Sequence, residues 1–208
     1  MNKFFKLKNK VKTHGAELHS TSGFTLIETL VAISIFSVSI LALFAVISQN
    51  IANISYSKKR VVAEYLAQEG IEYIRNVRDT YGLYSSDAQT GWISFNNRLL
   101  AANCHLANGC YFDARNVSFS DSTLPITDLI LTPCSASNCS DAPLLYDSAT
   151  GKYGYVPSAT TINSGYSRKI FLILSSSDEL KFSSTVYWTQ GSGTYSVVFS
   201  ESLFNWLE

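Results

Sequence analysis

Residues 22–36 read SGFTLIETLVAISIF, and they open an apolar run that extends to Ile47. Between Phe24 and Ile47 the only charged residue is Glu28, and no glycine or proline interrupts the run. As a helix, residues 24–47 would extend about 36 Å, which is enough to cross a hydrocarbon core of roughly 30 Å. The stretch therefore predicts a membrane-spanning helix. A carboxylate inside such a helix is costly, which indicates a function for Glu28.

The residues before this run are basic and favour a cytoplasmic N-terminus, with the remainder of the chain exported. A cleaved secretory signal is an alternative, but the run is long for one and no small-x-small site follows it closely. An ordinary uncleaved membrane anchor is a second alternative. The basic residues concerned are Lys3, Lys6, Lys8, Lys10 and Lys12, opposed by Glu17.

The formal charge of the whole chain is zero, with 16 basic and 16 acidic side chains. Five of the basic and one of the acidic residues precede Gly23, so 11 basic and 15 acidic residues follow it. This mildly acidic remainder gives no support to nucleic-acid binding.

Beyond Ile47 the helical pattern continues over residues 48–79 but becomes amphipathic. Apolar residues recur at three- and four-residue steps, while basic and acidic residues up to Arg78 occupy the other face. We expect one continuous helix from about Thr25 to Arg78, stopped by Gly82, with its apolar stripe buried against the rest of the chain. Gly70 is a weak point of about 1 kcal/mol relative to alanine. The apolar positions are Ile51, Ile54, Val61, Val62, Tyr65, Leu66, Ile71, Ile74 and Val77.

Residues 80–208 are expected to form an exported α+β head. Over residues 80–166 we expect turns and short strands, a helical turn near residues 96–102, and a hairpin turning at residues 148–151. Residues 167–176, 180–190 and 194–201 read as antiparallel strands. Alternation places Val186 and Trp188 on one face, against the amphipathic helix, and the tail at 203–208 packs on the head.

Four cysteines lie on the exported side: Cys104, Cys110, Cys134 and Cys139. An oxidising compartment favours disulfides, and four cysteines allow three connectivities. We expect local pairing, Cys104 with Cys110 and Cys134 with Cys139. The alternative is a zinc site, although its cysteines are usually spaced more closely in pairs than these.

We find no set of catalytic residues, no metal site and no cofactor motif. His105 is the only histidine after Gly23, and it lies between two cysteines. The GSG at residues 191–193 joins two strands and therefore reads as a turn rather than a phosphate loop. Asp141 and Asp147 are weak calcium candidates without a dense acidic loop.

Gly23-Phe24-Thr25-Leu26-Ile27-Glu28, after a basic leader and before an apolar helix, resembles the processing site of type IV pilin precursors and type II secretion pseudopilins. EYLAQEGIEYIRNVRD at residues 64–79 and the stretch 186–206 also resemble minor pilins and minor pseudopilins. The resemblance implies a long N-terminal helix packed on a C-terminal antiparallel sheet. It implies that prepilin peptidase removes residues 1–23 by cleaving between Gly23 and Phe24, and that the Phe24 amine is methylated. Glu28 then pairs with a Phe24 amine, its own or a neighbour's, and sets the register of assembly.

The function implied is that of a non-enzymatic filament subunit. Its partners would be prepilin peptidase, other pilin or pseudopilin subunits, an inner-membrane assembly platform and the lipid bilayer, with a single membrane pass before assembly. Residues 37–50 lack the proline or glycine that many major pilins carry, which favours a minor subunit. The alternatives are a binding module displayed on a filament, as an adhesin or in DNA uptake, and a membrane-anchored exported domain of other function.

Overall fold

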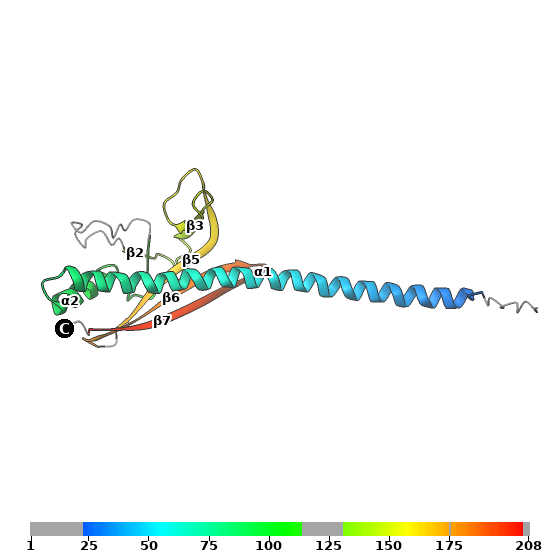
Figure 1. Cartoon of the computed structure of the whole chain (residues 1–208), viewed down its shortest axis with the longest axis horizontal. Helices are drawn as coiled ribbons and strands as arrows, with labels where there is room; N and C mark the ends of the chain where they lie inside the picture. The colour runs from blue at the N-terminus through cyan, green and yellow to red at the C-terminus, as the bar shows by residue number, and fades with distance from the viewer. Residues whose placement is uncertain (1–22, 114–130, 175, 206–208) are drawn as a thin grey trace, which may run out of the picture. The chain divides into compact units, whose positions relative to one another are not determined.

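The computed structural model describes residues 23–113, 131–174 and 176–205. The expected leader, apart from Gly23, and the last three residues of the expected tail lie outside the described residues. The chain divides into two compact units, Met1–Asn50 and Ile51–Glu208. One helix, α1 (Leu26–Tyr84), contributes to both (Figure 1).

In the first unit, α1 is an uninterrupted α-helix whose side chains face outward. Ile40 is half-buried, and every other side chain from Phe24 to Asn50 is exposed. The most apolar 18-residue window of α1 has a mean hydropathy of 2.8, and none of it is buried. By length and composition, this helix can cross a membrane.

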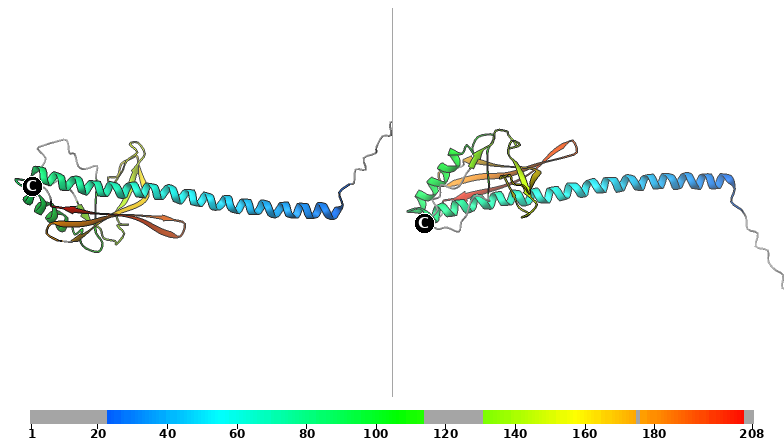
Figure 2. Two further views of the ribbon diagram at one scale, coloured as in Figure 1. Left: turned by 60° about the horizontal axis from the view of Figure 1, so that its bottom comes forward. Right: turned by 90° about the horizontal axis from the view of Figure 1, so that it is seen from above.

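In the second unit, α1 runs along one face of the sheet (Figure 1, Figure 2). Its buried residues recur at three- and four-residue steps from Ala63 onward, as an amphipathic helix requires. The predicted stripe was wrong at its beginning, because Ile51, Ile54, Val61 and Tyr65 are exposed. The buried residues are Ala63, Leu66, Ala67, Gly70, Ile71, Tyr73, Ile74, Val77, Arg78 and Tyr81.

The expected stop at Gly82 was also wrong, since α1 continues to Tyr84. A second helix, α2 (Ala88–Ala101), packs tightly against this last turn. A Cβ added to Gly91 would lie 2.6 Å from the carbonyl oxygen of Tyr81 and 3.1 Å from the Gly82 Cα. Two glycines therefore permit a close helix contact here, instead of ending the first helix.

The helical turn expected at residues 96–102 is the end of the 14-residue helix α2. Asp87 caps this helix, because its carboxylate accepts a hydrogen bond from the Thr90 backbone N–H at 2.8 Å. Aspartate before a helical segment is a common start signal, which the sequence analysis missed.

Within the described residues, seven strands form one antiparallel sheet: β1 (Cys110–Phe112), β2 (Leu131–Pro133), β3 (Pro143–Asp147), β4 (Tyr153–Gly154), β5 (Thr161–Leu174), β6 (Glu179–Gln190) and β7 (Gly193–Phe204). Strand β5 pairs with β1 and β3 along one edge and with β6 along the other. Strands β2 and β4 extend β1 and β3, and β7 extends β6. The long helix packed on this sheet confirms the α+β, pilin-like fold predicted from the sequence.

The turns between strands agree with the sequence. Strands β3 and β4 are joined across residues 148–151, as expected. Gln190 pairs with Gly193, which leaves a two-residue turn with Gly191 at a φ of +58°. That left-handed conformation suits a tight hairpin and favours glycine.

The core lies between α1 and the sheet in two neighbouring clusters. One gathers Ala63, Leu66 and Ala67 of α1 against Val186 and Trp188 of β6, which confirms the predicted face of that strand. The other joins the end of α1 to α2 and to the far ends of the strands, and it includes Ile74, Phe95, Phe112, Leu172 and Phe182.

Candidate functional site

The beginning of α1 carries the residues that the sequence singled out. Gly23 and Phe24 precede the helix and are exposed, Phe24 to 80%. A Cβ added to Gly23 would meet no atom within 4 Å. Packing within the described chain therefore does not require glycine at this position, which is consistent with a requirement imposed by another molecule.

Thr25 caps α1. Its hydroxyl oxygen accepts a hydrogen bond from the Glu28 backbone N–H at 3.3 Å. A threonine followed three residues later by glutamate is the pattern of a capping box, in which both side chains satisfy free N–H groups at a helix start. The TLIE sequence carries this start signal, and the bond in the structure is the one half of the box that Thr25 supplies.

The polar side chains further along the apolar segment are satisfied by the helix itself. The hydroxyls of Ser34, Ser37 and Ser39 donate to backbone carbonyl oxygens of the preceding turn, each at 2.8 Å. Such bonds let serine reside in an apolar medium at low cost. Glu28 is thus the one residue of 24–47 whose charge still needs a partner outside its own helix turn.

The head is fixed to α1 by a buried cation that the sequence analysis did not identify. Arg168 of β5 is 2% exposed, and its Nη1 lies 2.7 Å from Glu69 Oε2 on α1. The same nitrogen donates to the Leu66 carbonyl oxygen at 3.2 Å. The guanidinium also lies over the Phe112 ring, 4.3 Å from its centroid. These contacts join α1, β1 and β5 at one point.

A second ion pair joins α1 to the outer strand β7. Both Arg75 Nη2 and Nε donate to the Glu201 carboxylate, with Nη2 2.8 Å from each oxygen. Glu72 shares the same guanidinium at 2.8 Å. Because these side chains are partly exposed, their contribution to stability is modest.

The four cysteines form two disulfides, Cys104–Cys110 and Cys134–Cys139. These are the local pairings expected from the sequence. Lys169 of β5 connects the two loops, because its Nζ donates to the Ser137 carbonyl oxygen at 2.9 Å and to that of Ala107 at 3.4 Å. Burial in this position lowers the pKa of Lys169.

The two aspartates considered as calcium ligands are engaged by their own loops. Asp141 accepts hydrogen bonds from the backbone N–H groups of Ser135 and Ala136, which lower its pKa. Asp147 accepts from the hydroxyls of Thr160 and Thr150. Within the described ranges, no group of three or more histidine, cysteine, aspartate or glutamate side chains could hold a metal ion.

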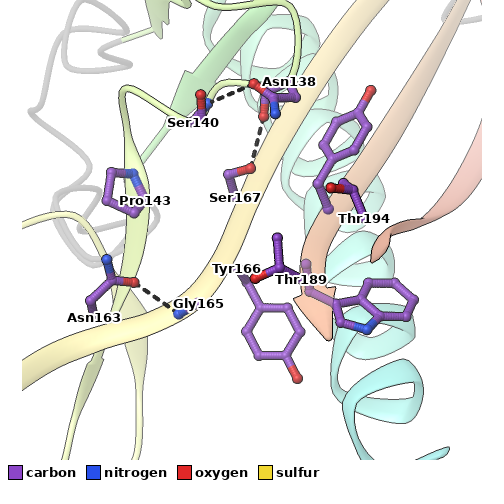
Figure 3. Close-up of a pocket in the computed structure, with 11 residues that line it drawn as sticks. Asn138, Ser140, Pro143, Asn163, Gly165, Tyr166, Ser167, Thr189 and Thr194 are labelled. Carbon is purple, nitrogen blue, oxygen red and sulfur yellow. Dashed lines mark hydrogen bonds between the residues drawn. The ribbon is translucent and has the colours of Figure 1, made fainter. Parts of the chain in front are cut away.

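An open pocket of about 190 Å³ lies where β5 bends (Figure 3). Its polar groups bond mainly to one another: Ser167 donates to the Asn138 carbonyl oxygen, and the Gly165 N–H donates to the Asn163 side chain. None of its lining residues is charged. The pocket is smaller than a typical small-molecule site and offers no acid, base or nucleophile pair.

The comparison with protein families supports the assignment of the first segment. Residues 18–44 match the family described as prokaryotic N-terminal methylation motif. The chain begins with a type IV prepilin-like signal. Residues 23–44 of this signal are described by the structure, and they comprise Phe24, the Thr25 cap, Glu28 and most of the exposed apolar helix.

The prepilin-like signal implies processing by a prepilin peptidase and assembly with other pilin-type subunits. It fits the apolar helix as a membrane anchor, and it fits a structural rather than enzymatic role. Neither the curated proteins nor the solved structures contain a match to the chain.

Proposed function

We propose that this protein is a minor pilin or pseudopilin, a structural subunit of a type IV pilus-like or type II secretion-like filament. The observation that supports this most directly is the exposed apolar half of α1, most of which lies within the prepilin-like signal at residues 18–44. An exposed surface of this length is unfavourable in water, so it needs lipid before assembly and neighbouring helices afterwards.

In this proposal the peptidase cleaves between Gly23 and Phe24, and Phe24 receives a methyl group on its new amine. The N-terminus of the precursor lies in the cytoplasm and the head lies outside, with one membrane pass. Glu28 becomes the fifth residue of the mature chain. Its carboxylate pairs with the cationic Phe24 amine of a neighbouring subunit, because an unpaired charge among apolar helices is strongly disfavoured.

The pilin-like arrangement of a helix on an antiparallel sheet in the second unit supports the same proposal. The head presents a sheet firmly attached to α1 through Arg168, Arg75 and the packed core, and it carries no recognisable catalytic arrangement in the described ranges. A head of this kind can serve as the outer surface of a fibre while α1 forms its interior. The absence of proline and glycine from residues 37–50 keeps α1 helical there and favours the minor-subunit role.

The test is the intact mass and N-terminal sequence of the full-length protein, recovered from membranes with and without a co-expressed prepilin peptidase. We expect a start at Phe24 with the peptidase, heavier by about 14 Da for one added methyl group. Gly23→Val serves as the matched variant and should remain uncut. A native chain that still starts at Met1 beside an active peptidase would overturn the proposal.

A further inference from the structure

The end of the β6–β7 hairpin lies against the first turns of α1 in the second unit. Gln190 Nε2 donates to the Ala52 carbonyl oxygen at 3.2 Å, and Lys59 Nζ donates to the Thr189 carbonyl oxygen at 3.0 Å. Further along, β7 meets α1 through Glu201 and Arg75. Of the contacts that β6 and β7 make with α1, those beside the hairpin turn at residues 191–192 are therefore the ones closest in sequence to the apolar segment.

Ala52 is only five positions after Ile47, the last residue of the apolar run. Even fully extended, five residues span at most about 18 Å. This connection is helical, which shortens the distance further, because a helix rises only about 1.5 Å per residue. Each headgroup layer of a bilayer is on the order of 5–8 Å thick. While residues 24–47 are in the membrane, the hairpin end is within reach of the bilayer surface.

The chemistry of this end suits an anionic lipid surface. Lys58, Lys59 and Arg60 are consecutive, and neither residues 51–63 nor residues 187–198 contain an acidic residue. Lys58 is exposed, and Lys59 is half-buried beside the hairpin. Arg60 is also exposed, but its Nε lies 3.0 Å from Glu64 Oε1, so part of its charge is balanced within α1. Three cations soon after a membrane segment on its exported side are contrary to the usual charge bias of membrane proteins. An anionic bilayer surface attracts each such cation by about fivefold in affinity, and Lys58 is the one of the three placed for it without an ion pair or hydrogen bond within the described residues.

Aromatic and apolar side chains surround these cations. The Tyr56 ring packs against Tyr195 and Trp188, with centroids 5.1 and 6.1 Å apart. Tyr195 is 39% exposed, whereas Ile51 and Ile54 are 63% and 68% exposed. Tyrosine is enriched at membrane interfaces, where its ring meets acyl chains and its hydroxyl meets water.

We infer that, before assembly, the head docks on the outer face of the bilayer through this end, which we define as the hairpin surface: residues 51–60 and 188–195. Its partner is the headgroup layer of anionic phospholipids. The inference rests on the proposed membrane anchoring of residues 24–47. It gives the cations of α1 a role that filament assembly alone does not require.

The test uses the full-length precursor in vesicles of phosphatidylcholine alone or with about one-third phosphatidylglycerol. A fluorescent label is attached at Ser192→Cys in the hairpin turn, or at Ser86→Cys between α1 and α2 as the matched control. Lipids with spin-labelled headgroups serve as quenchers. We expect strong quenching of the Ser192 label in anionic vesicles and little quenching of the Ser86 label.

Charge variants test the chemistry of the contact. Lys58→Gln should weaken docking about fivefold, and Lys181→Gln, at an exposed lysine of β6, should leave it unchanged. Equal quenching of both labels, or quenching insensitive to lipid charge and to Lys58→Gln, would overturn the inference. Extraction of the protein by alkaline carbonate would instead show that the chain is not membrane-inserted, and would contradict the proposed function itself.

Discussion

Arg168 and Glu69 form an ion pair across the interface between β5 and α1, with Nη1 and Oε2 2.7 Å apart. The arginine is almost fully buried, whereas 43% of the glutamate side chain is exposed. Glu69 therefore neutralises the charge of Arg168, whose guanidinium is shielded from water. Its position makes the attachment of the sheet to the helix dependent on Glu69.

Removing the carboxylate should destabilise the head. We expect Glu69→Ala to lower the free energy of unfolding by about 2 kcal/mol, because it leaves the Arg168 charge buried without its partner. Glu72→Ala is the matched control on the same helix. It should cost less than about 0.5 kcal/mol, because Arg75 keeps Glu201 and the site is exposed. Denaturant unfolding of the full chain in detergent micelles measures both, and equal effects would contradict this role of Glu69.

Gly70 should not tolerate a side chain, although it lies within a helix. A Cβ there would clash with the Ser184 hydroxyl and would lie 3.0 Å from the Ser184 Cβ. We expect Gly70→Ala to cost about 2 kcal/mol, despite the better helix propensity of alanine. Adding Ser184→Gly should recover most of the loss. If Gly70→Ala raised the melting temperature, the close packing would not matter and propensity would dominate.

Two neighbouring substitutions separate the helix-capping role at the start of α1 from the charge role. Thr25→Ala removes the cap and keeps the Glu28 charge, whereas Glu28→Gln removes the charge and leaves the Thr25 cap in place. We expect both variants to be cleaved by the peptidase, but only Glu28→Gln to be lost from filaments. The measurement is the fraction of each variant in sheared fibres by immunoblot. A larger loss for Thr25→Ala would identify capping as the function of this motif.

The head should lose stability in alkali. Burial raises the pKa of Tyr155 to about 12, against 10.0 for an ordinary tyrosine. The neutral form is thus favoured in the folded state, so its contribution is complete below pH 10 and is lost as the pH rises through about 12. We expect Tyr155→Phe to reduce the fall in stability between pH 8 and pH 11 by about 1 kcal/mol. Unfolding at the two pH values measures this, and an unchanged fall would contradict the assignment.

Features encoded in neighbouring residues were predictable from the sequence. The apolar helix, the Gly23-Phe24 junction and the final strands are read from composition, spacing and alternation over a few residues. Val186 and Trp188 could be placed on the helix-facing side of β6 because the period of a strand fixes which residues share a face. The fold class followed from these elements.

Features that depend on contacts between distant residues were not predictable in the same way. Arg168 lies in a strand as part of an SRK triplet, which reads as solvent-exposed, and its partner Glu69 is about a hundred positions earlier. By its local sequence Gly70 reads only as a weak point of the helix, because Ser184, which approaches it, lies on β6. Ile51, Ile54 and Tyr65 fit a helical stripe by spacing, yet their side chains are exposed, because the sheet covers a narrower face of α1 than the spacing of apolar residues predicts.

The local pairing of the cysteines has a consequence for the order of events after export. Each disulfide joins residues only five or six positions apart. Each bond can therefore form as soon as its own loop reaches an oxidising compartment, whether or not β5 to β7 have been synthesised or paired. Exchange of partners between the loops would need reopening of both. We expect oxidation to be complete before the sheet closes on the helix, so that the oxidising machinery needs access only to short, newly exported loops.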